Sequence, residues 1–291
     1  MDALNVVLIT GISGSGKSVA LRMLEDAGYT CVDNLPVRFL HEFIASMRDG
    51  LTRRVAVAID VRSPGDLDEL PSVLTALYSM GTQLRVVFLD ADDVTLTQRY
   101  SESRRRHPLS DRMSAGGTIV PSLQECISLE RELLDPLRNQ AHVIDTSGLI
   151  PGQLRTWIRD LIQADRSPLI LTFESFAFKN GVPRDADLVF DVRCLPNPHY
   201  DPTLRPLTGC DQPVAQWLSG FADVGAMIND IEAFVRKWLP RYTEDTRSYL
   251  TVAIGCTGGK HRSVYVVETL GRRFADHKQQ LVRHRNRPEF A

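Results

Sequence analysis

The chain has 291 residues and a formal net charge of −2 at pH 7, a length that exceeds the usual single domain and predicts two domains, each with its own core. Hydrophobic residues make up 43% and charged residues 24%, the composition of a folded globular protein rather than a disordered one. The near-neutral charge excludes a uniformly basic nucleic-acid binder, so a basic surface has to be sought locally.

The five cysteines are odd in number and scattered, and none forms a Cys-x-x-Cys pair. Such spacing indicates neither a disulfide framework nor a zinc site, and it favours a reducing cytoplasm. The N-terminus has no cationic segment followed by a long apolar stretch, and no apolar run approaches the ~18 residues of a membrane span. We therefore expect a cytoplasmic protein that is neither secreted nor inserted in a membrane.

The first half of the chain alternates short β-type runs with helical patterns, which predicts a parallel α/β sheet. Polar residues, glycines and prolines fall between these runs, where turns are required. The segment 164–168 is the predicted linker, so the N-terminal domain is expected to comprise residues 1–165. Its strands are predicted at 6–10, 29–32, 55–60, 84–90 and 142–145, and its helices at 17–27, 37–48, 67–80, 94–106, 123–138 and 153–162.

The second half, residues 166–291, is predicted to form a smaller α/β domain. Five prolines between 196 and 213 make that segment a loop, because proline disrupts helices. The predicted strands are 169–178, 187–193 and 249–255, and the predicted helices are 214–218, 224–238 and 262–277.

The most specific motif is GISGSGKS at residues 11–18, a complete G-x-x-x-x-G-K-[ST] loop that directly follows the apolar run 6–9. A buried strand that delivers a glycine-rich turn to a helix N-terminus presents backbone N–H groups to phosphates. Lys17 is expected to reach the β- and γ-phosphates, and the Ser18 hydroxyl to hold Mg²⁺. The motif predicts a P-loop NTPase or kinase-like fold that binds ATP or another nucleoside triphosphate through Gly11, Ile12, Ser13, Gly14, Ser15, Gly16, Lys17 and Ser18.

Two aspartates compete for the role of supporting the metal. A buried strand ends in Asp90, which we favour as the Mg²⁺-supporting carboxylate, with Asp60 as its rival and helix N-capping as the alternative for either. The run Asp60, Val61, Arg62 and Ser63 also lies at the carboxyl edge of the sheet, where ligands bind in open α/β folds. It is a candidate contact for a base or a second substrate.

A cluster of arginines follows the fourth predicted strand: Arg99, Arg104, Arg105, Arg106 and Arg112. It is either a lid that stabilises charge on the γ-phosphate or a solvated helix face. Asp33 follows the second strand, where small-molecule P-loop kinases often keep the residue that orients the acceptor hydroxyl, and a turn cap explains it equally well.

The second domain has its own phosphate-binding signal, GCTGGKHRS at residues 255–263, between an apolar strand and a helix. The spacing Cys-x₅-Arg-Ser matches the anion loop of cysteine phosphatases, in which backbone N–H groups hold a phosphate and lower the thiol pKa. Gly255 replaces the histidine that normally precedes such a cysteine. Phosphate or phosphosugar binding is therefore favoured over phosphatase chemistry by Cys256 and over a structural glycine turn, and Arg193 and His199 are candidates for the same pocket.

The C-terminus carries a local basic surface that the whole-chain charge conceals. It is either a binding site for RNA or another polyanion or a solubilising tail. Its cations are Arg272, Arg273, Lys278, Arg283, Arg285 and Arg287, against two carboxylates in the same stretch.

Five motifs together resemble the RapZ/YvcJ family of bacterial RNase adapters and nucleotide-binding proteins. They are GISGSGKS at 11–18, VDNLP at 32–36, DVRS at 60–63, FDVRCLPNPH at 190–199 and GCTGGKHRS at 255–263. The resemblance covers essentially the whole chain, and the two C-terminal motifs are far more specific than the phosphate loop. It favours a regulator over a generic small-molecule kinase that uses Asp33, the alternative from a different class.

The resemblance implies binding of both ATP and GTP with weak hydrolysis, with the GTP contacts carried over to Asp60, Val61, Arg62 and Ser63. It also implies a C-terminal domain that senses glucosamine-6-phosphate, binds small regulatory RNA and presents it to ribonuclease E, in a homo-oligomer, a tetramer in the proteobacterial branch. Other branches bind a nucleotide sugar and need not bind RNA. The sugar-phosphate pocket carries over to His199, Cys256, Thr257, Gly258, Gly259, His261 and Arg262, and RNA binding to the basic residues from Arg272 onward.

Overall fold

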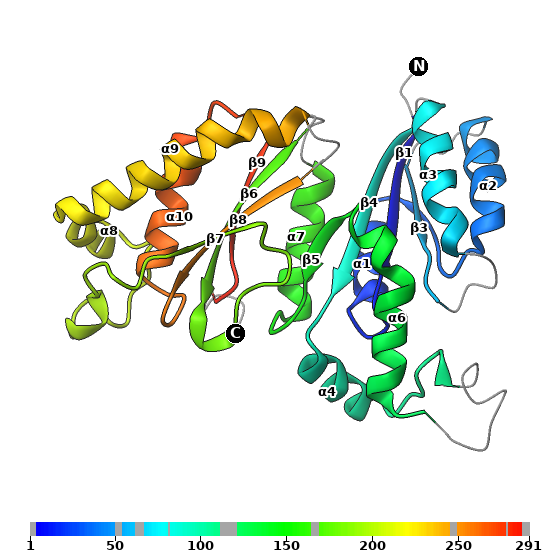
Figure 1. Ribbon diagram of the computed structural model, residues 1–291, viewed down its shortest axis with the longest axis horizontal. Helices are drawn as coiled ribbons and strands as arrows, with labels where there is room; N and C mark the ends of the chain where they lie inside the picture. The colour runs from blue at the N-terminus through cyan, green and yellow to red at the C-terminus, as the bar shows by residue number, and fades with distance from the viewer. Residues whose placement is uncertain are drawn as a thin grey trace. The chain divides into compact units, whose positions relative to one another are not determined.

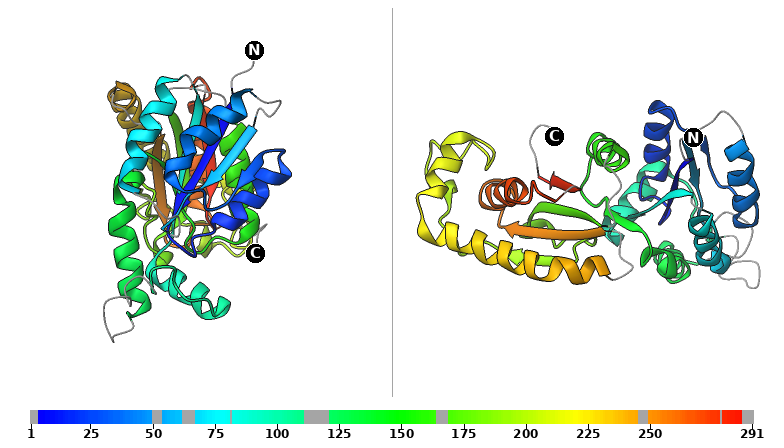
Figure 2. Two further views of the ribbon diagram at one scale, coloured as in Figure 1. Left: turned by 90° about the vertical axis from the view of Figure 1, so that its right-hand side faces the viewer. Right: turned by 90° about the horizontal axis from the view of Figure 1, so that it is seen from above.

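The computed structural model describes residues 4–49, 54–61, 67–80, 82–110, 121–163, 169–244, 249–277 and 279–286. The chain divides into two compact units, one of residues 1–147 and 151–159 and the other of residues 148–150 and 160–291, and each has its own hydrophobic core. Each unit is a parallel sheet with helices packed against it (Figure 1 and Figure 2). The predicted α/β fold class is confirmed, and the predicted linker at 164–168 lies outside the described residues.

The sheet of the first unit has the strand order β2-β3-β1-β4-β5, and every pairing is parallel. In the central strand β1, Val6, Val7, Leu8 and Ile9 are fully buried, as expected where helices cover both faces of a parallel sheet. Both neighbours of β1 end at the edge where the phosphate loop begins, which is where ligands bind in such folds. The strands are β1 (Asn5–Gly11), β2 (Thr30–Val32), β3 (Arg54–Ala58), β4 (Gln83–Asp90) and β5 (His142–Asp145).

Local signals in the sequence set the limits of several helices. The side chain of Asp92 caps the helix that follows β4, and a reciprocal Ser122–Glu125 capping box starts the next one. The helix predicted to reach residue 106 ends at Ser103, because Arg104 adopts a left-handed conformation with φ 52°. The helices are α1 (Lys17–Asp26), α2 (Val37–Asp49), α3 (Leu70–Ser79) after the 3₁₀ turn η1 (Leu67–Glu69), α4 (Asp93–Ser103), α6 (Leu123–Arg138) and α7 (Pro151–Gln163).

The second unit has a parallel sheet in the order β7-β8-β6-β9. Its strands are β6 (Ile170–Ala177), β7 (Leu188–Asp191), β8 (Tyr249–Cys256) and β9 (Gln280–His284). Its helices are α8 (Gln212–Ser219), α9 (Ala222–Glu244) and α10 (Arg262–Arg273), with 3₁₀ turns η2 (Phe178–Asn180) and η3 (Pro198–Tyr200). Helix α10 packs against β6, β8 and β9 and starts directly after the loop that follows β8.

The end of the chain differs from the predicted helix and basic tail. Helix α10 ends at Arg273, and β9 adds a strand beside β6. The sequence of β9, QLVRH, has only two apolar residues, so its pattern did not predict a strand, but Arg283 and His284 are buried there. Within the described residues, no helix combines the length and the apolar character needed to cross a lipid bilayer.

Candidate functional site

The loop between β1 and α1 depends on glycine for its shape. Gly11, Gly14 and Gly16 all have positive φ, at 130°, 91° and 108°. A Cβ on Gly11 would collide with the backbone oxygen of Leu89, and one on Gly16 would lie 2.8 Å from Leu154 Cδ2. The glycines of the motif are therefore fixed by both backbone conformation and space.

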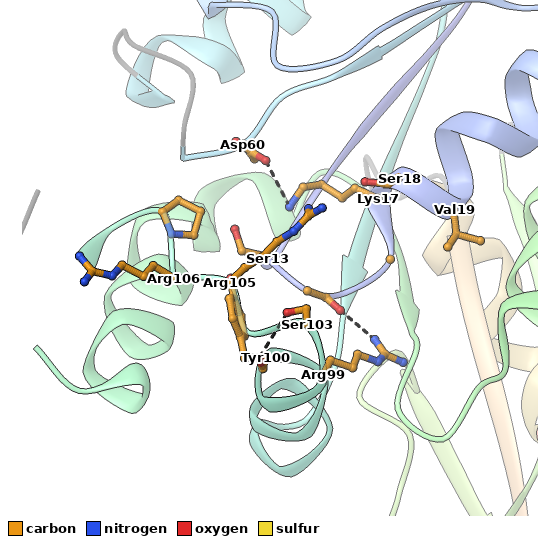
Figure 3. A pocket seen from close by; sticks show the side chains of 13 residues that line it. Ser13, Lys17, Ser18, Val19, Asp60, Arg99, Tyr100, Ser103, Arg105 and Arg106 are labelled. Carbon is orange, nitrogen blue, oxygen red and sulfur yellow. Dashed lines mark hydrogen bonds and ion pairs between the residues drawn. The ribbon is translucent and has the colours of Figure 1, made fainter. Parts of the chain in front are cut away.

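The N-terminus of α1 is open to a ligand. Gly16 is its N-cap in a left-handed conformation, and no side chain caps the helix, so the first-turn amides remain available to an anion. A cavity of about 410 Å³ lies here, and Gly14, Gly16, Lys17 and Ser18 contribute to its lining (Figure 3). The side chain of Ser15 behind it is buried, and its Oγ has no hydrogen-bond partner among the described residues. These features fit a bound polyphosphate.

The first residues of the motif use their hydrogen-bond donors within the fold, although Ser13 also lines the cavity. The amide of Ser13 donates to Glu130 Oε2 at 2.9 Å, and its hydroxyl donates to Glu130 Oε1 at 2.7 Å. Glu130 is fully buried, and its Oε2 also lies 3.0 Å from His107 Nε2. The amide of Ile12 donates a hydrogen bond to the Leu89 oxygen. The Ser15 amide donates to the Ile12 oxygen at 3.0 Å. We therefore revise the phosphate-donating amides to those of Gly14, Gly16, Lys17 and Ser18, with Gly11, Ile12 and Ser13 as scaffold.

Lys17 and Asp60 face each other at the cavity (Figure 3). Lys17 Nζ donates to the Gly11 oxygen at 2.6 Å and lies 3.6 Å from Asp60 Oδ2. Asp60 follows β3, the direct neighbour of β1, and it lines the cavity. With Ser18 it supplies the hydroxyl and carboxylate oxygens that Mg²⁺ prefers.

Asp90 is engaged elsewhere, which corrects its assignment to the metal. Its Oδ1 accepts from Arg131 at 2.6 Å and from the Ala91 amide at 2.8 Å, and Arg138 Nε lies 3.7 Å from its Oδ2. Arg131 also bridges to Asp93 at 2.9 Å. Asp90 thus holds α6 to the end of β4, and we transfer the metal-supporting role to Asp60.

The arginine cluster divides into two kinds. Arg99 is a brace: it donates to the oxygens of Gly14 and Thr146 at 3.0 and 2.8 Å, and burial lowers its pKa despite the nearby carboxylates. Arg105 and Arg106, beyond the end of α4, line the cavity and can contact the phosphates of a ligand. Arg112 lies outside the described residues.

Only part of the predicted GTP segment is described. Asp60 lines the cavity, and Val61 is buried in the core. Arg62 and Ser63 lie outside the described residues. Asp33, the residue on which the kinase alternative depends, is exposed and is not part of the cavity lining.

The loop between β8 and α10 in the second unit also joins a parallel strand to a helix N-terminus, with a different backbone conformation and other side chains. The N-cap of α10 is His261, and no side chain caps that helix. Gly259 has φ 63°, and a Cβ on it would lie 2.6 Å from Asn286 Oδ1. A Cβ on Gly255 would collide with the rings of Phe178 and Phe176, which is why the residue before Cys256 has no side chain.

Cys256 is buried, and its Sγ lies 3.1 Å from Ser263 Oγ. Burial by itself raises the pKa of this thiol, but hydrogen bonds from Ser263 and the Gly259 amide and the charge of Arg262 outweigh it and lower the pKa. An environment that stabilises a thiolate also suits another anion.

The remaining residues of the predicted sugar-phosphate set gather around this loop. Arg262 donates to the oxygens of Arg193 and Leu195 at 2.7 and 3.1 Å and to Thr257 Oγ1 at 3.3 Å, so it fixes the loop.

The rings of His261 and the exposed His199 lie 6.5 Å apart. Burial lowers the pKa of His261, and its Nε2 is a buried atom without a hydrogen-bond partner among the described residues. Gly258 adjoins open space. Arg193, a candidate for the same pocket, forms an ion pair in which its Nη2 lies 2.7 Å from Asp191 Oδ2.

The predicted RNA-binding cations have unequal positions. Arg272 is exposed on the last turn of α10, and Arg273 pairs with Glu232 at 2.8 Å. Arg283 is 3% exposed, and Arg285 pairs with the buried Glu174 at 3.1 Å. The expectation of an exposed tail is wrong for these last two, because β9 draws them into the sheet. Lys278 and Arg287 lie outside the described residues.

Comparisons with known proteins agree with these features. Residues 4–166 match the RapZ-like N-terminal domain, and residues 169–288 match the RapZ C-terminal domain. A nucleotide-binding protein of Bordetella petrii is 75% identical over 282 residues, 97% of either chain. One of Burkholderia multivorans is 56% identical over 287 residues, 98% of this chain and 95% of that one. Shikimate kinase from Acinetobacter baumannii is 18% identical, covering 55% of this chain and 94% of its own, with a TM-score of 0.37. The resemblance found in the sequence is confirmed, and the chain belongs to the RapZ family of nucleotide-binding proteins.

Proposed function

We propose that the protein is a cytoplasmic RNA adapter whose nucleotide site and amino-sugar-phosphate site control its binding of a small regulatory RNA. The observation that carries this proposal is the presence of two strand-to-helix turns without a side-chain cap, one in each unit. Each is an anion site by its backbone geometry. Two such sites in separate units suit a protein that reads two phosphorylated ligands.

The first unit is the nucleotide-sensing part of this proposal. The amides of Gly14, Gly16, Lys17 and Ser18 hold the phosphates of ATP or GTP, and Lys17 exchanges its bond to Gly11 for phosphate oxygens. Ser18 and Asp60 would hold Mg²⁺, which would neutralise charge on the phosphates. Hydrolysis of the bound nucleotide is expected to be weak.

The second unit is the sugar-phosphate sensor. Amides at residues 257–262 hold the phosphate of glucosamine-6-phosphate or a related sugar. The imidazoles of His199 and His261, whose rings lie 6.5 Å apart, provide polar partners for the sugar hydroxyls. The unpartnered Nε2 of His261 supports this assignment, because buried polar atoms are normally hydrogen-bonded.

Helix α10 links the sugar-phosphate loop to RNA. It starts at Arg262 in the loop and ends at Arg272 and Arg273, about 17 Å away for a 12-residue helix. RNA bound at its C-terminal end and sugar phosphate at its N-terminal end therefore act on one rigid element. Coupling between them requires that each ligand favours a different state of that element. The bound RNA is presented to ribonuclease E by a homo-oligomer, which we expect to be a tetramer.

The test is the affinity of the full chain for small regulatory RNA, measured with and without saturating glucosamine-6-phosphate and with ATP or GTP. We expect the sugar phosphate to change RNA affinity by at least about fivefold, the lower end of typical coupling. An RNA affinity that stays the same at saturation rules out the sensor. Transfer of phosphate from ATP to a metabolite would instead favour a kinase.

A further inference from the structure

Three side chains that are far apart in the sequence meet in the second unit. Cys210 precedes α8, Glu268 lies on α10, and His284 ends β9. The Glu268 Oε1 atom lies 3.6 Å from Cys210 Sγ and 2.9 Å from His284 Nε2. The three ligand atoms all lie within 4.8 Å of one another. The nucleotide site and the sugar-phosphate site use none of the three.

The spacing between Cys210 and Glu268 matches tetrahedral zinc, whereas His284 Nε2 and Glu268 Oε1, now 2.9 Å apart, would have to separate by about 0.5 Å. Bonds of about 2.3 Å to sulfur and about 2.1 Å to oxygen at a tetrahedral angle place the two atoms about 3.6 Å apart. The observed distance between Cys210 Sγ and Glu268 Oε1 is 3.6 Å. Thiolate and imidazole together favour zinc over magnesium or calcium, which take oxygen ligands.

The histidine is already oriented as a zinc ligand. Its Nδ1 lies 2.8 Å from the hydroxyl of Ser175, which is fully buried on β6. Without a metal, Nε2–H donates to the Glu268 carboxylate, and Nδ1 accepts from the Ser175 hydroxyl. These two contacts fix the ring with Nε2 directed at the other two ligands, and with zinc in place of the Nε2 proton, Nδ1–H would donate to the Ser175 oxygen. Metal-binding histidines normally have such a partner on their second nitrogen.

Exposure increases across the cluster and provides an entry path. The His284 side chain is 3% exposed, the Glu268 side chain is 33% exposed, and Cys210 is exposed. We propose that Cys210, Glu268 and His284 form a Zn²⁺ site whose fourth position, on the solvent side, is open to water or an external ligand. Binding releases the Cys210 thiol proton to solvent, and the single proton of the neutral imidazole moves from Nε2 to Nδ1, from which it is donated to Ser175.

The experiment uses the untagged full chain after treatment with a chelator, and zinc chloride is titrated by calorimetry. Cobalt(II) is the second probe, because a thiolate ligand gives it a charge-transfer absorption. The variants are Cys210→Ser, Glu268→Gln and Ser175→Ala, and Cys194→Ser is the matched control because Cys194 is also an exposed cysteine outside any disulfide.

We expect one zinc per wild-type chain and at least a tenfold loss of affinity in Cys210→Ser and Glu268→Gln. Ser175→Ala should weaken binding about 10- to 100-fold, the usual effect of removing a histidine's partner. The cobalt–thiolate band should disappear in Cys210→Ser and persist in Cys194→Ser. The site is refuted if the wild type binds no zinc, if Cys210→Ser retains wild-type affinity and the band, or if Cys194→Ser loses as much.

Discussion

The two strand-to-helix loops, residues 11–18 and 255–262, both lead into a helix without a side-chain cap, and they differ in backbone conformation and in the surrounding side chains. In the first loop, Lys17 and Asp60 provide a cation and a carboxylate at a cavity, a combination suited to a polyphosphate with its metal. In the second, Cys256 and His261 surround the amides, and the Arg262 charge is bonded to backbone oxygens. In both loops, main-chain amides at a helix N-terminus can bind an anion, and the neighbouring side chains determine which ligand fits.

The largest expected effect comes from the first glycine of the nucleotide loop. Gly11→Ala adds a Cβ that meets the Leu89 oxygen at a position with φ 130°. We expect it to lower the free energy of unfolding of the first unit by about 3 kcal/mol or more, from strain and overpacking together. Urea unfolding followed by hydrogen exchange locates the loss.

Gly28→Ala is the matched control, because Gly28 also has positive φ, 82°, but adjoins open space. Gly28→Ala should lower the free energy of unfolding by about 1 kcal/mol, because only the unfavourable backbone conformation contributes. Equal losses in the two variants would show that the loop is not confined by β4.

Lys17→Ala is expected to weaken ATP and GTP binding about 10- to 100-fold, because charged hydrogen bonds to phosphate contribute about 1.5–3 kcal/mol. The measurement is calorimetric titration with each nucleotide. Arg48→Ala is the control, since its exposed guanidinium contacts only the Met80 oxygen among the bonds described for it. A Lys17→Ala protein that binds nucleotide like the wild type would remove the first loop from the proposal.

Asp60 and Asp90 provide a direct test of the corrected metal assignment. Asp60→Asn should reduce the gain in nucleotide affinity on adding Mg²⁺ about tenfold, the equivalent of one charged contact. Asp90→Asn should leave that gain unchanged but lower the free energy of unfolding by about 1–3 kcal/mol, because it breaks the bond to the partly buried Arg131. The reverse pattern in magnesium titrations and thermal unfolding would restore Asp90.

The smallest effect is expected at the end of α10. If Arg272 neutralises one phosphate of single-stranded RNA, Arg272→Ala should flatten the log–log salt dependence of binding by about 0.7. Binding isotherms at several salt concentrations measure that slope. Arg205→Ala is a control cation, whose Nε donates to the His199 oxygen. An unchanged slope in Arg272→Ala would exclude this residue from the RNA contact.

The sequence predicted the two folds and both loops because their signals are local. A glycine-rich turn between a buried strand and a helix can be recognised from neighbouring residues alone, without knowledge of distant contacts. Glu130 could not be predicted, since it occupies a helix that looks amphipathic and meets Ser13 only in the fold. Asp90 was misassigned for the same reason: both β3 and β4 flank β1, and only the pairing with Arg131 distinguishes their aspartates. The cluster of Cys210, Glu268 and His284 likewise depends on β9, whose short polar sequence conceals a strand.

The most direct test of two independent phosphate sites is a crossed titration. ATP and glucosamine-6-phosphate are titrated by calorimetry into the wild type, Lys17→Ala and His261→Ala. The account predicts that Lys17→Ala loses ATP affinity alone, that His261→Ala loses sugar-phosphate affinity alone, and that neither ligand displaces the other. Loss of both ligands in one variant, or displacement of the sugar phosphate by ATP, would contradict it.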